Sequence, residues 1–188
     1  MSLKVTRAGE YPVSCWAGGK TTQLCIYPPE SEYAKRNFIF RISSATVECE
    51  RSEFTVLPQV ERIIMPLEGN LELSFGGYGQ AFLRPFEQAR FDGGWNTTSI
   101  GKAADFNLML REGAKGDLKV ITLNPGEVLS IHCRQKEITV LFAVRGSCGQ
   151  GLLETGSLLM MEGTEQLTLE NDRSEVCRLI CARIVLPC

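Results

Sequence analysis

A short stretch late in the chain combines side chains that can hold a metal ion. Residues 125–137 read PGEVLSIHCRQKE and bring together an imidazole, a thiol and a carboxylate, those of His132, Cys133 and Glu137. Such groups bind zinc and other divalent ions, which need several lone pairs that converge on one point. The next residue, Arg134, has no lone pair to offer. The first question is therefore whether this stretch forms a metal site at all.

The rest of the chain supplies few further ligands. The spacing from Pro125 to His132 resembles the first signature of the cupin barrels, in which a second histidine would stand at Arg134. A metal-binding cupin collects three imidazoles and a carboxylate, but His132 is the single histidine of this chain. Neighbouring strand residues point to opposite faces, so His132 and Cys133 would not converge on one ion. We therefore expect a barrel without a metal and without another cofactor.

Polar side chains also interrupt an otherwise apolar strand in the first half. In NFIFRISSATVE (37–48), alternation puts Arg41 and Ser43 on one face and Phe38, Phe40 and Ile42 on the other. Both faces are largely apolar, so the strand should be buried on both sides. A guanidinium in such a place requires a charge partner or a ligand, because burying it unpaired is costly.

The stretch DFNLMLR (105–111) has the same character. Asp105, Asn107, Met109 and Arg111 point one way, and the intervening Phe and Leu side chains point the other. On periodicity alone, this pattern is typical of an edge strand with one face in water. The alternative is that Asp105 and Asn107 line the same cavity as Arg41 and Ser43. Such a cavity would offer arginine donors to a carboxylate and acceptors to an amide, imine or amine.

The elements that position these residues are predicted to be strands. Helical periodicity over a dozen residues is absent, and many short β-rich stretches at close spacing favour a sandwich or a barrel. Tight turns are expected at GGYG (76–79) and GG (93–94), and YPPESEYAKR (27–36) is typical of a loop with one helical turn in its second half. The predicted strands are 37–48, 61–67, 70–75, 105–110, 118–123, 138–144, 157–161, 165–170 and 176–186.

A weak internal repeat indicates two related halves. RIIMPLEGNLEL (62–73) resembles TVLFAVRGSCGQ (139–150), and FDGGWNTTSI (91–100) resembles MEGTEQLTLE (161–170). Two copies of one β-unit would form an all-β bicupin, in which one chain carries two cupin-like barrels. We expect residues 1–112 to form the first half, which carries the pocket, and residues 113–188 to form a second half packed intimately against it.

Composition and charge exclude several classes of protein. The net charge is −2, and no run of Lys and Arg is interleaved with aromatic residues, so a nucleic-acid partner is not expected. The N-terminus lacks the apolar core of a secretory signal, and no stretch approaches the 18 unbroken apolar residues of a membrane span. We expect a soluble, cytoplasmic protein that does not associate with membranes.

Five motifs in order resemble the HutD/Ves family. They are CWAGGKTTQL (15–24), FRISSATV (40–47), VER (60–62), FDGG (91–94) and DFNLMLREG (105–113). The chain departs from the family pattern at SEF (52–54), where Gly-Pro-Phe is common, and at Phe40, where tryptophan is frequent. The motifs end at residue 113, and beyond it the resemblance is one of fold.

This resemblance implies both an architecture and a role. It implies a bicupin without the usual metal ligands, and a small-molecule binder or regulator connected to histidine utilisation through urocanate and formiminoglutamate. It also implies a pocket with the family's shared polar residues. Carried over to this chain, they are Trp16, Gly18, Thr21, Arg41, Ser43, Arg62, Asp105, Asn107 and Arg111.

Three classes of function remain open. The first is a non-enzymatic sensor that binds a small carboxylated metabolite of the formylglutamate, formiminoglutamate or urocanate type, with Arg41 and Arg62 on the carboxylate and Asn107, Ser43 and Thr21 on the remaining polar atoms. The second is a metal-independent enzyme on such a metabolite, with Asp105 as general base. The third is a protein-interaction module, in which the apolar stretches LLMM (158–161) and LICARIVL (179–186) form a subunit interface. A homodimer is the expected oligomer.

Overall fold

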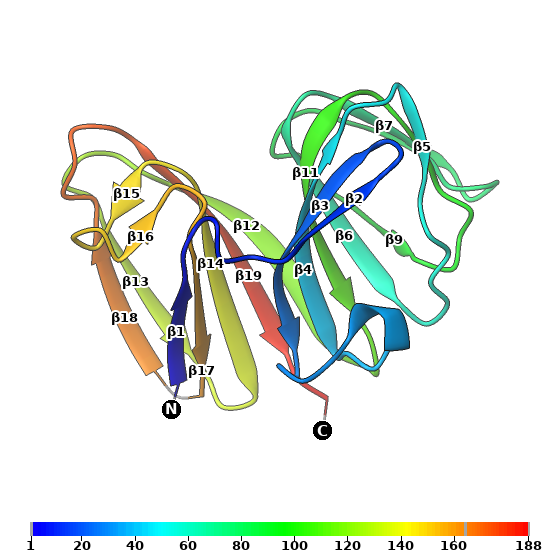
Figure 1. The fold of residues 1–188 in the computed structure, drawn as a ribbon. Helices are drawn as coiled ribbons and strands as arrows, with labels where there is room; N and C mark the ends of the chain where they lie inside the picture. Colours follow the sequence, from blue (N-terminus) through cyan, green and yellow to red (C-terminus); the bar gives the residue numbers. More distant parts are fainter. Residues whose placement is uncertain (1, 164, 188) are drawn as a thin grey trace. The chain divides into compact units, whose positions relative to one another are not determined.

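The computed structural model describes residues 2–163 and 165–187 as an all-β protein, which confirms the predicted fold class (Figure 1). No α-helix is present in the described part of the chain. The predicted helical turn in the loop at 27–36 is a 3-10 turn, η1 (Tyr33–Lys35). Nothing helical within the described residues is long and apolar enough to span a membrane.

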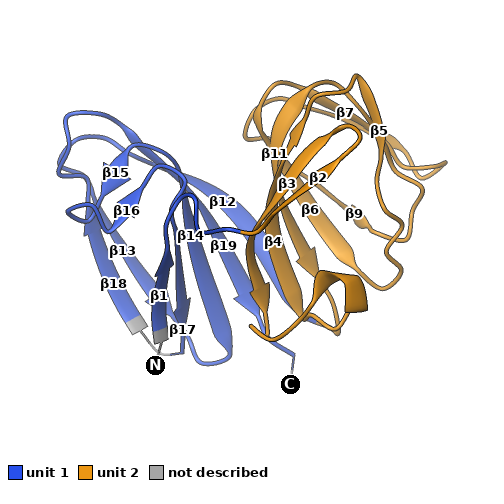
Figure 2. Ribbon diagram, viewed as in Figure 1, with its two compact units in different colours: residues 1–11, 114–188 blue, residues 12–113 orange. Residues whose placement is uncertain are grey.

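The chain folds into two compact units, coloured separately in Figure 2. Unit 1 comprises residues 1–11 and 114–188, and unit 2 comprises residues 12–113. The division follows residue 113, one residue beyond the predicted boundary. Residues 1–11, which the sequence analysis assigned to the first half, pack instead with the C-terminal unit. The reason is backbone pairing, because β1 (Ser2–Thr6) runs antiparallel to β17 (Leu158–Glu162).

Unit 2 contains two sheets. The larger has six strands in the order β2-β3-β4-β11-β6-β9, and the smaller has four in the order β5-β10-β7-β8. The strands are β2 (Val13–Trp16), β3 (Gly19–Tyr27), β4 (Phe40–Val47), β5 (Arg51–Glu53), β6 (Glu61–Glu68), β7 (Leu71–Ser74), β8 (Gln80–Leu83), β9 (Ala89–Asp92), β10 (Thr98–Ile100) and β11 (Ala103–Leu110).

Unit 1 contains a five-stranded sheet and two strand pairs. The sheet has the order β1-β17-β14-β19-β12, and the pairs are β13-β18 and β15-β16. Its remaining strands are β12 (Lys115–Leu123), β13 (Val128–Cys133), β14 (Glu137–Arg145), β15 (Ser147–Cys148), β16 (Leu153–Glu154), β18 (Glu165–Glu170) and β19 (Cys177–Val185).

The two units repeat one strand arrangement. The neighbours β9-β6-β11-β4 of unit 2 correspond in order to β17-β14-β19-β12 of unit 1, and the pairs β5-β10 and β7-β8 correspond to β13-β18 and β15-β16. A β-bulge also recurs at the same place, since the register shifts past Leu67 in β6 and past Val144 in β14. These residues are equivalent in the two halves of the predicted repeat, so the repeat reflects the structure.

All nine predicted strands are present, with ends within a few residues of those expected. The GGYG turn has positive φ at Gly76, Gly77 and Gly79, as predicted. Gly93 and Gly94 also form a turn, but for a different reason. A Cβ on Gly93 would lie 2.9 Å from the carbonyl oxygens of Leu57 and Val60, so close approach of the backbone, and not positive φ, requires glycine there.

Each unit buries an apolar core. In unit 1 the cluster includes Leu141, Leu159, Met161 and Leu179, so the stretches LLMM and LICARIVL supply core residues. In unit 2 an apolar cluster fills one part of the interior, with Ile64, Leu71, Leu73, Phe75 and Phe91 among its members. Polar residues continue along the same inner face of the six-stranded sheet, and there the interior is hollow.

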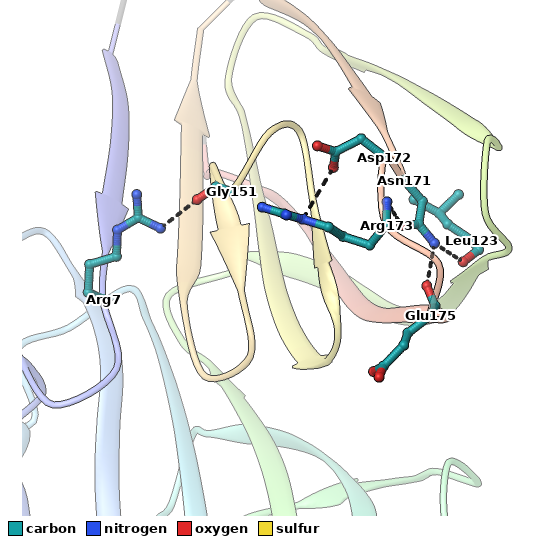
Figure 3. Close-up of polar contacts among 7 residues, drawn as sticks. All are labelled: Arg7, Leu123, Gly151, Asn171, Asp172, Arg173 and Glu175. Atoms are coloured by element: carbon teal, nitrogen blue, oxygen red, sulfur yellow. Dashed lines mark hydrogen bonds and ion pairs between the residues drawn. The ribbon is translucent and has the colours of Figure 1, made fainter.

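Side-chain hydrogen bonds fix the loops of unit 1 (Figure 3). Asn171, which is fully buried, donates through Nδ2 to the carbonyl oxygens of Leu123 and Glu175, both at 2.8 Å. Its Oδ1 accepts from the backbone N–H of Arg173 at 3.1 Å. One amide thereby ties the loop between β18 and β19 to the end of β12. Arg7 fastens the N-terminal segment by donating to the carbonyl of Gly151 at 3.0 Å.

Candidate ligand-binding pocket

A pocket of about 340 Å³ opens on the inner face of the six-stranded sheet of unit 2. Strands β4, β6 and β11 supply its floor, and residues 52–55 and the β2–β3 hairpin supply its sides. The central strand, β11, pairs with β4 on one side and β6 on the other. The edge-strand interpretation of DFNLMLR is therefore wrong. Asp105 and Asn107 face the pocket that Arg41 and Ser43 also line.

Cross-strand pairing arranges the polar side chains in three rows. The first row, the arginine row, is Arg41–Met109–Arg62, and in it the two arginines flank a methionine. The second row, the amide row, is Gln23–Ser43–Asn107. The third row, the aspartate row, is Thr21–Ala45–Asp105. Successive rows are two residues apart along the strands, or about 7 Å.

Arg41 is buried without a carboxylate partner. Its Nε donates to Oε1 of Gln23 at 2.9 Å, its Nη1 donates to Oγ of Ser43 at 3.1 Å, and its guanidinium lies 4.2 Å from the ring centroid of Tyr33. Burial lowers the pKa of Arg41, although the nearby Tyr33 hydroxyl acts in the opposite sense. Neutral acceptors and an aromatic ring thus hold this guanidinium. None of the described acidic residues forms an ion pair with it to balance its buried charge.

Arg62, at the other end of the arginine row, is also buried and forms no ion pair with a described residue. Its guanidinium lies 4.5 Å from the ring centroid of Phe54 and 5.4 Å from that of Phe91, in cation–π geometry. Its Nε is buried and has no hydrogen-bond partner among the described residues. Burial lowers the pKa of Arg62 to about 10, so the side chain still carries its charge at neutral pH. Stacking holds the group in place but leaves the Nε–H donor unused.

Asn107 and Asp105 supply acceptors further along β11. Asn107 is 5% exposed, and its Oδ1 is buried with no hydrogen-bond partner among the described residues. Asp105 is 4% exposed and receives a hydrogen bond from the backbone of Ala45. Burial raises the pKa of Asp105 to about 7, although the positive charge of Arg62 lowers it. No lysine or arginine among the described residues forms an ion pair with Asp105.

The remaining predicted residues divide between the rim and the outside of the pocket. Trp16 and Thr21 line it, and Trp16 is 40% exposed. Gly18 does not line the pocket. A Cβ on it would lie 2.3 Å from the ring of Trp16, so this glycine makes room for the indole. Arg111 does not line the pocket either, and its guanidinium lies 5.6 Å from the ring centroid of Phe38.

Comparison with known proteins shows which family the chain belongs to. The family model described as HutD matches residues 8–179, which is most of the chain. The chain belongs to the HutD family. Protein Ves of Cronobacter sakazakii (strain ATCC BAA-894) is 34% identical over 107 residues, equal to 53% of this chain and 56% of that protein. The match thus spans little more than half the length of this curated relative. The predicted resemblance to the HutD/Ves family is confirmed.

Solved structures show the same fold over the whole chain. PA5104, a conserved protein of unknown function from Pseudomonas aeruginosa PAO1, has a TM-score of 0.82 at 24% identity and covers 98% of this chain and 99% of its own. HutD from Pseudomonas fluorescens SBW25, from a formate condition, has a TM-score of 0.76 at 19% identity, with both chains fully covered. The nickel(II) complex of the Escherichia coli pirin YhhW has a TM-score of 0.73 at 11% identity, again with both chains fully covered. These likenesses confirm the bicupin fold.

Several pocket residues were not predicted from the HutD-family motifs. Ser52, Glu53 and Phe54 line the pocket, although the sequence analysis treated SEF only as a departure from the family pattern. Tyr33, from the 3-10 turn, stacks on Arg41. Gln23 accepts a hydrogen bond from the Nε–H of Arg41. Gln23 lies inside the motif CWAGGKTTQL, and its alternation with Thr21 could have revealed it. The loop position of Tyr33 gave no such signal.

The stretch that first suggested a metal site lies in unit 1. His132 is exposed and Cys133 is buried, on opposite faces of β13, as alternation predicted. The thiol of Cys133 donates to the backbone carbonyl of Glu137 at 3.0 Å, and the Glu137 carboxylate lies 3.9 Å from Arg183. Within the described residues, no three or more His, Cys, Asp or Glu side chains are grouped to hold a metal ion.

Proposed function

We propose that the unit 2 pocket binds a small metabolite that carries a carboxylate. The observation that carries this proposal is the arginine row, in which two buried guanidinium groups form no ion pair with an acidic side chain among the described residues. The two arginines lie on strands separated only by β11, so their Cα atoms are about 10 Å apart and their long side chains can converge above Met109. A carboxylate there would receive charge-assisted hydrogen bonds and neutralise buried positive charge.

The proposed role is that of a sensor or regulator in histidine utilisation, with a ligand of the formylglutamate, formiminoglutamate or urocanate type. Membership of the HutD family and the likeness to HutD of Pseudomonas fluorescens support this role. In this account Asn107, Ser43 and Thr21 contact the remaining polar atoms of the ligand.

A thermal-shift screen tests this function. The acids are urocanate, formiminoglutamate, formylglutamate, histidine, glutamate and formate, each with and without a divalent metal. A ligand that binds only the folded protein raises the melting temperature, and the rise continues with the logarithm of ligand concentration above the dissociation constant. We expect a concentration-dependent shift with at least one acid, unchanged by metal or chelator, and its loss in Arg41→Ala. Arg84→Ala is the matched control, because Arg84 is exposed and does not line the pocket.

Two outcomes would contradict the proposed function. An undiminished shift in Arg41→Ala would show that the acid binds elsewhere, and no shift with any of the acids would favour the protein-interaction module. The shift is measured as the difference between each variant with and without the acid, so a change in the stability of the variant itself does not affect the result.

A second candidate function is a metal-independent enzyme. Burial raises the pKa of Asp105 to about 7, which is near the value that suits a general base at neutral pH. Turnover of one of the same acids that disappears in Asp105→Asn, while binding persists, would favour this function. Binding of these acids without turnover of any of them would favour the sensor over the enzyme.

A further inference from the structure

We propose that the pocket selects acids whose opposite end is a planar, cationic N–H donor, such as an amidinium or a guanidinium, and that Asp105 and Asn107 bind this end. The inference rests on the proposed function, because it takes the arginine row as the site of the carboxylate. It goes further by stating the charge and the hydrogen-bonding character of the rest of the ligand.

The first argument is the order of polar groups along β11. Asn107 lies about 7 Å and Asp105 about 13 Å from Met109 along the strand, all on the same face. Donors therefore gather at one end of the pocket and acceptors at the other. A ligand that extends along β11 from the arginine row meets Asn107 first and Asp105 next. Such a ligand needs a carboxylate at one end and N–H groups several ångströms away.

The second argument is that the acceptors are unused. Asn107 Oδ1 is buried without a hydrogen-bond partner, and a buried amide oxygen without a partner is costly. Asp105 has one hydrogen bond, from the backbone of Ala45, and forms no ion pair with a described residue. A carboxylate can accept several hydrogen bonds, and a planar amidinium or guanidinium supplies them in a matching geometry.

The third argument is charge balance. The charged or titratable side chains that line the pocket with Asp105 are Arg41, Arg62, Tyr33 and Glu53. A bound carboxylate would attract both arginines and weaken the stabilisation that Arg62 gives to ionised Asp105. A cationic group beside Asp105 restores that stabilisation, whereas a neutral amide does not. Burial raises the pKa of Asp105, which agrees with a carboxyl group that has no cationic group in contact with it.

Isothermal titration calorimetry with three matched acids tests this inference. The probes are 4-guanidinobutyrate, which ends in a cation, 4-ureidobutyrate, its neutral counterpart with N–H donors, and 6-methylheptanoate, which has the same heavy-atom connectivity and no donor. We expect 4-guanidinobutyrate to bind roughly ten-fold or more tightly than 4-ureidobutyrate, and 6-methylheptanoate to bind most weakly. Because the cation favours ionised Asp105, its binding near pH 6.5 should release a fraction of a proton, which titration in buffers of different ionisation enthalpy detects.

Two variants assign the preference to residues. Asp105→Asn should reduce the ratio of guanidino to ureido affinity to about one and abolish proton release, while carboxylate binding persists. Asn107→Leu should weaken both donor-bearing acids and leave 6-methylheptanoate unaffected or tighter. Thermal unfolding of each variant without ligand shows whether it is folded.

The outcomes separate the inference from the proposed function. Equal affinity for the three acids in the wild-type protein, with each of them lost in Arg41→Ala, would overturn the inference and keep the carboxylate site. A cation preference that survives in Asp105→Asn would also overturn it. No binding of any of the three acids, together with no response to the pathway acids, would overturn both.

Discussion

Asp105 is the residue whose burial has the clearest consequence for the stability of the protein. Its pKa rises from the ordinary value of 3.8 to about 7, because a charged carboxylate is poorly solvated in this pocket. Between these two values the folded protein binds a proton that the unfolded chain releases. Stability therefore falls as pH increases through this window, and the loss is complete above the folded pKa.

This linkage gives a prediction for Asp105→Asn. The amide is close in shape to the protonated carboxyl group and does not titrate. The variant should exceed the wild-type protein in free energy of unfolding at both pH 5 and pH 8, and its advantage should be larger at pH 8 by roughly 2–3 kcal/mol. Urea denaturation at the two pH values measures this difference. The explanation fails if the wild-type protein and the variant lose stability equally between pH 5 and pH 8.

At the scale of single elements, β11 shows what sequence patterns can and cannot supply. Alternation predicted which side chains share a face, and the structure confirms it for Asp105, Asn107 and Met109. Alternation could not decide whether that face meets bulk water or an internal cavity, because both environments favour polar residues. The answer depends on the pairing of β11 with β4 and β6, which are distant in sequence.

The same limit explains the residues that were missed. Tyr33 and Phe54 stack on Arg41 and Arg62, so they determine how each guanidinium is held. Tyr33 lies in a 3-10 turn and Phe54 follows the three-residue strand β5, and neither segment is long enough to show a periodicity. Their contacts arise from the tertiary fold. A sequence analysis could find the buried arginines, but not the aromatic residues beside them.

At the scale of the whole molecule, the two units share a strand order but differ in their interiors. Strand pairing makes Thr139 the counterpart of Arg62, Cys181 that of Asn107, and Leu179 that of Asp105. Leu179 and Cys181 belong to the apolar core cluster of unit 1. The counterparts of these three polar side chains are thus small or apolar, and the interior is packed. Those of Arg41 and Ser43 are Asp117 and Lys119, which are exposed. A single arrangement supports a polar pocket in one unit and an apolar core in the other.

Exchanging one pair of counterparts tests this difference. Cys181→Asn puts an amide into a packed apolar interior and should lower the free energy of unfolding by roughly 1–3 kcal/mol. The reverse exchange, Asn107→Cys, removes a buried acceptor without a partner and should cost little or increase stability. Urea denaturation compares the two variants with the wild-type protein. Equal costs for both exchanges would show that the two interiors do not differ in this way.

The most direct test of the central claim is a crystal structure of the protein soaked with the acid that gives the largest thermal shift. The account predicts a carboxylate above Met109, within hydrogen-bonding distance of the guanidinium groups of both Arg41 and Arg62. Density for the acid at any other site, or a pocket that stays free of it at saturating concentration, would contradict the account.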